Sequence, residues 1–152
     1  MKRTTTVSAS RLRRGFRRGG SLIETAICLG ILLNLTFGAV EFGYYFYVKN
    51  MLDGAAREGC RAGIPPSAGS NTVVTTAVTG ALTTCNFPNG CITTSVTDTS
   101  GNAIDVSTVA VGTQIQVKVT ATWSTIGAGF RPLNLIGGTK TVTGLCVMRK
   151  EG

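Results

Sequence analysis

A carboxylate lies near the start of a long apolar run, a few residues after a basic glycine pair. The stretch reads Arg17-Arg18-Gly19-Gly20-Ser21-Leu22-Ile23-Glu24. Placing an acid inside a membrane helix costs about 2.5 kcal/mol or more, and such acids usually have a partner. A peptidase cut after Gly19 would create an ammonium group on Gly20, one helical turn from Glu24 or within reach of Glu24 on a neighbouring subunit. We therefore predict an assembly or processing role for Glu24.

The candidate processing site is Gly19, Gly20 and Ser21, because glycine keeps the backbone open to the close approach of an intramembrane active site. A second interpretation of Glu24 remains open. Its carboxylate could lie at the level of the helix N-terminus, where the helix dipole favours it and headgroups hydrate it. Glu41, near the other end of the run, is either a solvated interfacial acid or a contact to a partner helix, and we assign it no role.

Five cysteines are the other reactive side chains. Cys28 falls inside the apolar run and is interpreted as a small packed side chain. The remaining four are Cys60, Cys85, Cys91 and Cys146. In an oxidising compartment they allow two disulfides with three connectivities, of which we favour Cys85 with Cys91 and Cys60 with Cys146. A zinc site is the alternative, but no Cys-x-x-Cys spacing supports it.

Enzyme chemistry is not predicted. The chain has no histidine, which removes Ser-His-Asp, Cys-His and His-Glu-x-x-His arrangements. Asp98 and Asp105 could pair as carboxylates, but they flank the turn residues 99–102, where aspartate is favoured for local hydrogen bonding. The glycine-rich stretch 126–138 lacks a phosphate-loop pattern and is predicted to be a loop. We expect neither a cofactor nor a metal.

The net charge of +8 is concentrated at the N-terminus. Seven of the fifteen basic residues precede Gly19, where there is no acid, whereas eight basic and seven acidic residues follow it. The pattern gives no reason to expect a nucleic-acid partner. A basic segment directly before an apolar span is typical of the cytoplasmic side of a membrane helix.

The apolar span 22–40 has 19 residues, which reach about 28 Å as a helix and match the ~30 Å hydrocarbon core of a bilayer. Tyr44, Tyr45 and Tyr47 follow and suit the outer membrane interface. The helical pattern continues to Arg61 and is stopped by the prolines at 65 and 66. The domain organisation expected is a basic cytoplasmic leader at 1–19, a transmembrane helix with its extension at 20–62, and a small extracytoplasmic domain at 63–152.

The fold class expected for the small domain is α+β. Ser70 or Asn71 can cap a short helix whose apolar residues fall on one face between 73 and 82. Alternation of apolar and polar residues over 114–123 is the clearest strand signal. Residues 91–98 and 139–149 are β-branched and make two further strands, so about three antiparallel strands should pack on helices.

The sequence resembles the TadE-like pseudopilins, the minor pilins of the Tad (tight adherence, Flp-type) pilus system. The resemblance rests on Arg-Arg-Gly followed by Glu24, on Val40-Glu41-Phe42-Gly43-Tyr44, on the segment 53–59 and on the terminal segment 141–149. It implies processing by a prepilin peptidase, retention in the inner membrane and a part in pilus assembly and adhesion. The implied partners are other pilins or pseudopilins, the peptidase, the inner-membrane assembly platform and the lipid bilayer.

Two features depart from the family pattern. An extra glycine leaves the cut after Gly19 or after Gly20 open, and many members lack the four cysteines. The alternative function is a single-pass, membrane-anchored ligand-binding or adhesin protein with an uncleaved signal anchor, its C-terminal domain in the periplasm or at the cell surface.

Overall fold

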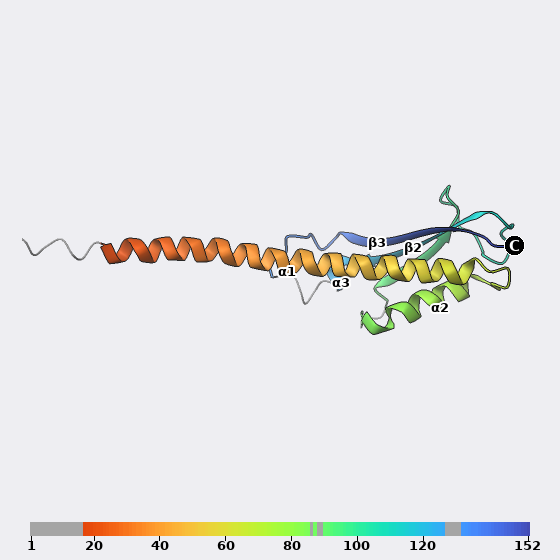
Figure 1. The fold of residues 1–152 in the computed structure, drawn as a ribbon, viewed down its shortest axis with the longest axis horizontal. Helices are drawn as coiled ribbons and strands as arrows, with labels where there is room; N and C mark the ends of the chain where they lie inside the picture. Colours follow the sequence, from red (N-terminus) through yellow and green to blue (C-terminus); the bar gives the residue numbers. More distant parts are fainter. Residues whose placement is uncertain (1–16, 86, 88–89, 127–131) are drawn as a thin grey trace, which may run out of the picture. The chain divides into compact units, whose positions relative to one another are not determined.

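The computed structural model describes residues 17–85, 87, 90–126 and 132–152, with side chains from Gly19 onward. The elements in chain order are α1 (Arg17–Gly63), α2 (Asn71–Leu82), the 3-10 turn η1 (Thr83–Cys85), β1 (Ile92–Thr97), β2 (Gln114–Thr122), α3 (Trp123–Ile126) and β3 (Thr141–Arg149) (Figure 1). Two compact units divide the chain, Met1–Phe37 and Gly38–Gly152, and α1 contributes to both. The α+β expectation is confirmed, whereas most of the predicted leader lies outside the described residues.

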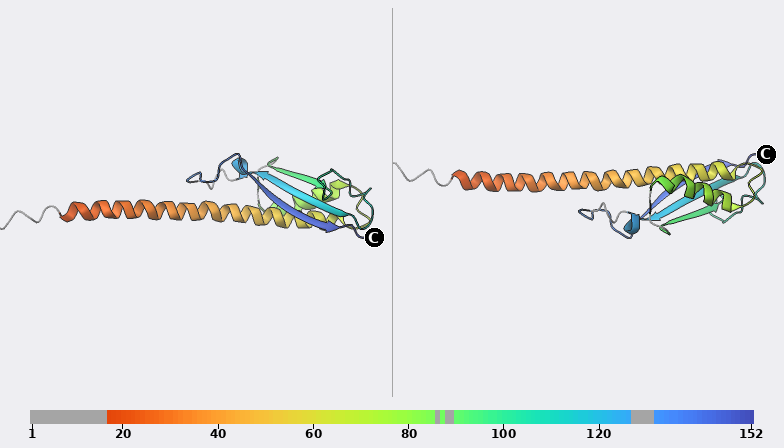
Figure 2. Two further views of the ribbon diagram at one scale, coloured as in Figure 1. Left: turned by 90° about the horizontal axis from the view of Figure 1, so that it is seen from above. Right: turned by 90° about the horizontal axis from the view of Figure 1, so that it is seen from below.

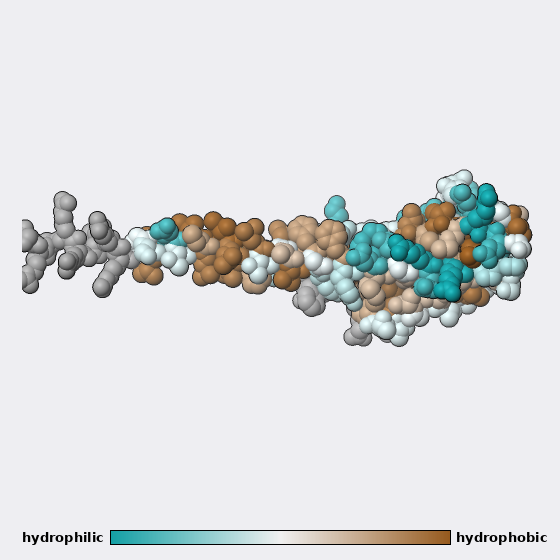
Figure 3. All heavy atoms as spheres, viewed as in Figure 1, coloured by the Kyte–Doolittle hydropathy of each residue, from teal (hydrophilic) through white to brown (hydrophobic). Residues whose placement is uncertain are grey.

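In the first unit, the described residues are entirely helical and every side chain from Gly19 to Phe37 is exposed. Apolar surface covers much of this helix (Figure 3). Its polar side chains bond the helix itself: Thr25 Oγ1 donates to the Ser21 carbonyl at 2.8 Å, Asn34 Nδ2 to Gly30 at 2.9 Å, and Thr36 Oγ1 to Leu32 at 2.8 Å. These polar side chains therefore form their hydrogen bonds within the helix. This suits a helix in lipid, where no water is available as a hydrogen-bond partner. The helix Gly19–Gly63 is long and apolar enough to cross a membrane.

The second unit contains a three-stranded antiparallel sheet in the order β1-β2-β3. The predicted alternation is confirmed along β2: Ile115, Val117, Val119 and Ala121 are fully buried, and the polar residues between them lie on the other face. In the register of the sheet, Val117 lies between Val96 of β1 and Cys146 of β3. The sheet therefore has one core face, as its period-two pattern requires.

Helices α1 and α2 cover that core face (Figure 2). Ser70, one of the two predicted caps, caps α2 by accepting a hydrogen bond from the Thr72 amide, and Val74, Val78 and Leu82 are the buried residues of α2. A Cβ on Gly59 of α1 would lie 2.7 Å from Val78 and 3.2 Å from Val117, so glycine allows α1 to approach both α2 and β2. Trp123, fully buried, completes the core.

Helix α1 ends at Gly63, just before the prolines, and a buried lysine holds the following segment. Lys150 Nζ donates to the carbonyls of Gly63 at 3.3 Å, Pro65 at 2.9 Å and Val106 at 2.9 Å. A cation at a helix C-terminus interacts favourably with the helix dipole. Lys150 is only 5% exposed, and the three carbonyls satisfy its three donor hydrogens.

Three expectations differ from the structure. The helix α3 was not predicted, and it includes Ile126, the first residue of the loop predicted over 126–138. Residues 132–138 contain no helix or strand, as predicted, and 127–131 lie outside the described residues. Tyr44 and Tyr45 are half-buried against Trp123, at ring distances of 5.8 and 5.4 Å, and only Tyr47 is exposed as an interfacial residue would be. A run of tyrosines in the sequence shows that the segment is amphipathic. It does not show whether the rings pack against the membrane interface or against the protein's own core.

Candidate functional site

The predicted processing residues and Glu24 lie together on the first turns of α1. Gly19, Gly20 and Ser21 are helical and exposed, and a Cβ on either glycine would meet nothing within 4 Å. Glu24 is exposed one turn further on and, within the part of the chain that the structure describes, makes no hydrogen bond or ion pair. Any partner of this carboxylate would therefore be a group outside the described residues.

Glu41 has a different environment. Its side chain is fully buried, and Oε1 accepts a hydrogen bond from the Ile136 amide at 2.9 Å. Its second oxygen, Oε2, has no hydrogen-bond partner among the described residues. Of the two interpretations left open for Glu41, the solvated interfacial acid is wrong, because the segment before β3 folds over Glu41, a contact across 95 positions of sequence. The other interpretation, a contact to a partner helix, stays a hypothesis.

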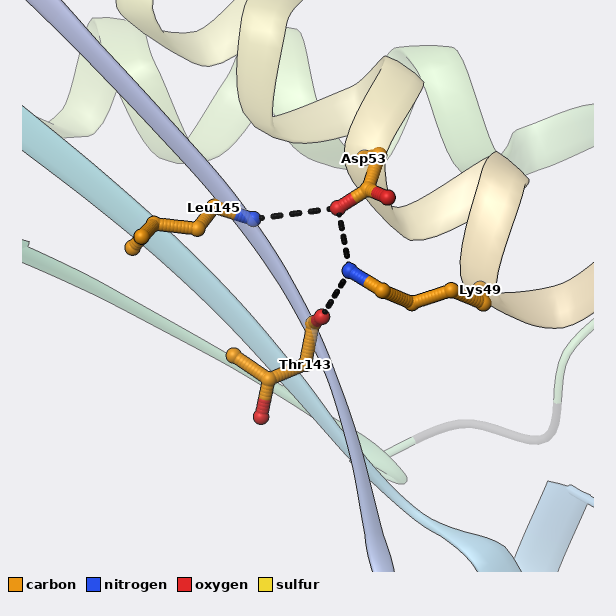
Figure 4. Close-up of polar contacts among 4 residues, drawn as sticks. All are labelled: Lys49, Asp53, Thr143 and Leu145. Atoms are coloured by element: carbon orange, nitrogen blue, oxygen red, sulfur yellow. Dashed lines mark hydrogen bonds and ion pairs between the residues drawn. The ribbon is translucent and has the colours of Figure 1, made fainter.

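Two charged residues of α1 bind the edge of the sheet (Figure 4). Lys49 Nζ lies 2.7 Å from Asp53 Oδ1 and donates to the Thr143 carbonyl at 2.7 Å, while the Leu145 amide donates to Asp53 Oδ1 at 3.2 Å. We call these four residues the edge clamp. Because β3 is an edge strand, these backbone groups would otherwise remain open for pairing with another chain.

The hydrogen bonds of the edge clamp matter more than its ion pair. The side chains of Lys49 and Asp53 are 37% and 27% exposed, and an ion pair at that exposure contributes only about 0–1 kcal/mol. Hydrogen bonds to charged groups contribute about 1.5–3 kcal/mol each. The clamp therefore stabilises the unit mainly by joining α1 to the backbone of β3.

A glycine of β3 permits this close approach. A Cβ on Gly144 would overlap the carbonyl of Leu52 and lie 2.7 Å from the amide nitrogen of Asp53. Sequence reasoning did not single out Gly144 or Lys49. A glycine inside a predicted strand was the available signal, since such a residue often marks close approach by another backbone.

Of the four cysteines outside the predicted span, Cys60 and Cys146 come together, whereas Cys85 and Cys91 share a neighbour, Tyr44. Cys60 Sγ donates to the Cys146 carbonyl at 3.3 Å, and the two thiols also interact directly. Cys85, at the end of η1, and Cys91, just before β1, both pack against the core and lie near Tyr44. All five cysteines are free thiols in this structure. Burial raises the pKa of the Cys91 thiol, so less of it is present as the reactive thiolate.

Asp98 and Asp105 organise turns, as the sequence predicts. Asp98 Oδ1 accepts from the amides of Ser100 at 2.9 Å and Asn102 at 2.8 Å, and Oδ2 accepts from Asn102 Nδ2 at 3.1 Å. These bonds, the Asn102 side chain first among them, hold the pKa of Asp98 below its usual value. Ser107 has the same effect on the pKa of Asp105. Both carboxyl groups thus have local structural partners.

Comparison with known proteins finds one relationship. Residues 19–61 match the family described as TadE-like protein. The matched segment begins at Gly19 and contains Glu24, Glu41 and Asp53, so the resemblance is confirmed over most of α1. It does not include the terminal segment 141–149. Neither the curated proteins nor the solved structures provide a match.

Proposed function

We propose that this TadE-like chain is a non-enzymatic minor pilin of the Tad (Flp-type) pilus, processed by a prepilin peptidase and anchored in the inner membrane by α1. The observation that carries the proposal is that the TadE-like match starts at Gly19 and places Glu24 on an exposed apolar helix. Its partners are other pilins or pseudopilins, the peptidase and the inner-membrane assembly platform.

The two units suit different parts of this role. Apolar side chains cover the exposed helix of the first unit, including Leu22, Ile23, Ile27 and Leu35, which are 59–72% exposed. Such a surface needs lipid or other apolar helices around it. The second unit has its own core, and the edge clamp covers one edge of its sheet. It can therefore be stable in water outside the membrane. The basic leader favours placing the N-terminus in the cytoplasm.

The first prediction concerns processing. The chain extracted from its native membrane should begin at Gly20 or Ser21, as measured by intact mass and N-terminal sequencing. Replacing the glycine before the cut by leucine should abolish processing, because a side chain there blocks the close approach of the peptidase. Gly19→Leu and Gly20→Leu, made separately, therefore identify which bond is cut.

Gly30→Leu is the matched control for these variants. Like Gly19 and Gly20, Gly30 lies on α1 and a Cβ there meets nothing within 4 Å, so the three substitutions disturb the fold equally little. Processing should proceed normally in this variant. An N-terminus that still carries Arg17 and Arg18 would rule out the pilin mechanism and leave a signal-anchored binding or adhesin protein.

We also propose that Cys60 and Cys146 form a disulfide outside the cytoplasm, with Cys85 and Cys91 as the second pair. In each pair the two thiols would lose two protons and two electrons to a disulfide-donating oxidant of that compartment. The contact between Cys60 and Cys146 supports the first bridge, which would join α1 to β3. A bridge across so long a loop is expected to stabilise the unit by about 2–5 kcal/mol.

The second prediction follows from this pairing. The mass of the native chain should rise by two hydrogens per bridge on reduction, measured on the intact protein. Cys60→Ser should remove one bridge and release a reactive thiol at Cys146. Cys28→Ser, in the predicted span, should leave the mass change on reduction unaltered. A native chain with no mass change on reduction would contradict both bridges.

A further inference from the structure

The loop between α3 and β3 contacts the membrane end of α1. The Cδ1 atom of Leu135 lies 3.6 Å from the position of a Cβ on Gly38, and Gly38 belongs to the span 22–40 predicted from the sequence. Helical rise puts Gly38 about 3 Å inside the end of that span. Leu135 is nevertheless 57% exposed, so most of its side chain faces away from the protein at the depth where lipid begins.

Among residues 132–139 of the loop and 38–48 of α1, all of which the structure describes, there is no exposed charged residue. The described loop residues, 132–139, are Pro-Leu-Asn-Leu-Ile-Gly-Gly-Thr, and the facing part of α1, residues 38–48, has Glu41 as its one charged residue. Glu41 is fully buried. Val40, Phe42 and Phe46 of the same stretch are 47–59% exposed. This end of the second unit therefore presents apolar surface that can leave water at little electrostatic cost.

The loop is held in this position by specific contacts. The Ile136 amide donates to the buried Glu41 carboxylate, and Ile136 packs against the core. Asn134 has φ of 50°, a left-handed conformation that asparagine tolerates better than most residues and that turns the chain between Leu133 and Leu135. Leu135 is thus placed next to Gly38 by the fold.

We propose that the loop 132–138 is a second membrane contact, in which Leu135 inserts into the headgroup and acyl boundary of the bilayer that α1 crosses. Interfacial amphipathic elements bury their apolar side chains about 5–10 Å into that boundary. Two contacts, a helix and a loop, would fix the orientation of the second unit on the membrane surface. Glu41 is the positioning residue of the loop.

The proposal rests on the membrane-anchoring part of the proposed function, and the test separates the two. A fluorescent amino acid is introduced by codon reassignment at position 135, at position 29 in the span, or at position 111, in the full chain in phosphatidylcholine vesicles. Leu29, Leu135 and Val111 are all more than half exposed, so the label disturbs none of the core. Lipids brominated near the headgroup or deep in the acyl chain then quench the label according to depth.

The expected result is quenching of the label at 135 mainly by the shallow bromines, at 29 mainly by the deep bromines, and none at 111. Quenching at 29 without quenching at 135 would overturn the loop contact but keep the anchor. Absence of quenching at both would contradict the anchor as well. An apolar emission at 135 that bromines do not quench would place a protein partner, such as a second copy, over the loop and would also overturn the proposal.

A second arm tests Glu41. In Glu41→Leu the Ile136 amide loses its acceptor, so quenching of the label at 135 should fall, whereas Glu41→Gln keeps an acceptor oxygen and should keep the quenching. Circular dichroism of both variants checks that the unit remains folded. Equal quenching in the two folded variants would show that Glu41 does not position the loop.

Discussion

Replacing Glu24 by glutamine is expected to lower incorporation of the chain into assemblies with its partner subunits by at least tenfold. Glu24 is exposed on α1 and has no partner among the described residues, so in the proposed function its charge is compensated by a group from outside them. The new ammonium at Gly20 or Ser21, on the same chain or on a neighbour, is the group proposed above. In the glutamine variant that ammonium would lose its counter-charge, and a charge left unpaired in a membrane costs ~2.5 kcal/mol, which corresponds to roughly 60-fold in an equilibrium constant.

The measurement is co-purification of partner pilins, together with a count of filaments, in the native cell. Glutamine keeps the size and hydrogen-bonding capacity of the side chain, so a loss isolates the charge. Glu58→Gln is the matched control, because Glu58 is also an exposed acid of α1 but lies well beyond the predicted span. Membrane levels of the variants must be equal. Normal assembly in Glu24→Gln would support the alternative of a hydrated carboxylate at the helix N-terminus.

The second large effect is expected for Gly144→Ala, which should destabilise the second unit by about 3 kcal/mol. The new methyl group would overlap the backbone of α1 at Leu52 and Asp53, and neither a carbonyl nor an amide can move aside as a side chain can. Overpacking alone costs about 1–3 kcal/mol. Separation of α1 from β3 would also weaken the hydrogen bonds of the edge clamp, at about 1.5–3 kcal/mol each.

The unfolding midpoint of the full chain in detergent micelles, followed by circular dichroism, measures this loss. Gly54→Ala is the control, since Gly54 lies next to Asp53 on α1 but a Cβ there meets nothing within 4 Å. That variant should be as stable as the parent or gain up to about 1 kcal/mol from the better helix propensity of alanine. If Gly144→Ala unfolds at the same midpoint as Gly54→Ala, the close contact of α1 with β3 does not exist.

The edge clamp also has a consequence for assembly. Residues Lys49 and Asp53 fall inside the TadE-like segment, yet both bind the chain's own β3. Occupying those backbone groups removes sites at which a second chain could add a strand. In the proposed function, contacts between subunits are therefore expected along the exposed helix of the first unit rather than at this sheet edge.

Local patterns in the sequence were sufficient for the secondary structure. Three signals act within a few residues of the chain and do not depend on the tertiary fold. They are the period-two alternation of β2, the Ser70 cap of α2 and the prolines after α1. The apolar run of α1 likewise makes this helix long and apolar enough to cross a membrane, by length and composition alone. For the same reason Glu24 and its glycines could be recognised as candidates, because they are neighbours in sequence and on the helix.

Contacts between distant residues were decided only by the tertiary structure. Three contacts join segments that are far apart in the chain. They are the burial of Glu41 under Ile136, the hydrogen bonds of Lys150 to three carbonyls, and the approach of α1 to Gly144. No periodicity predicts such contacts, because they depend on which surfaces meet when helices pack on the sheet. The sequence by itself determined a helix long and apolar enough to cross a membrane, a capped short helix and a one-faced sheet. Packing decided which charges are buried, which edge is closed and which segment covers Glu41.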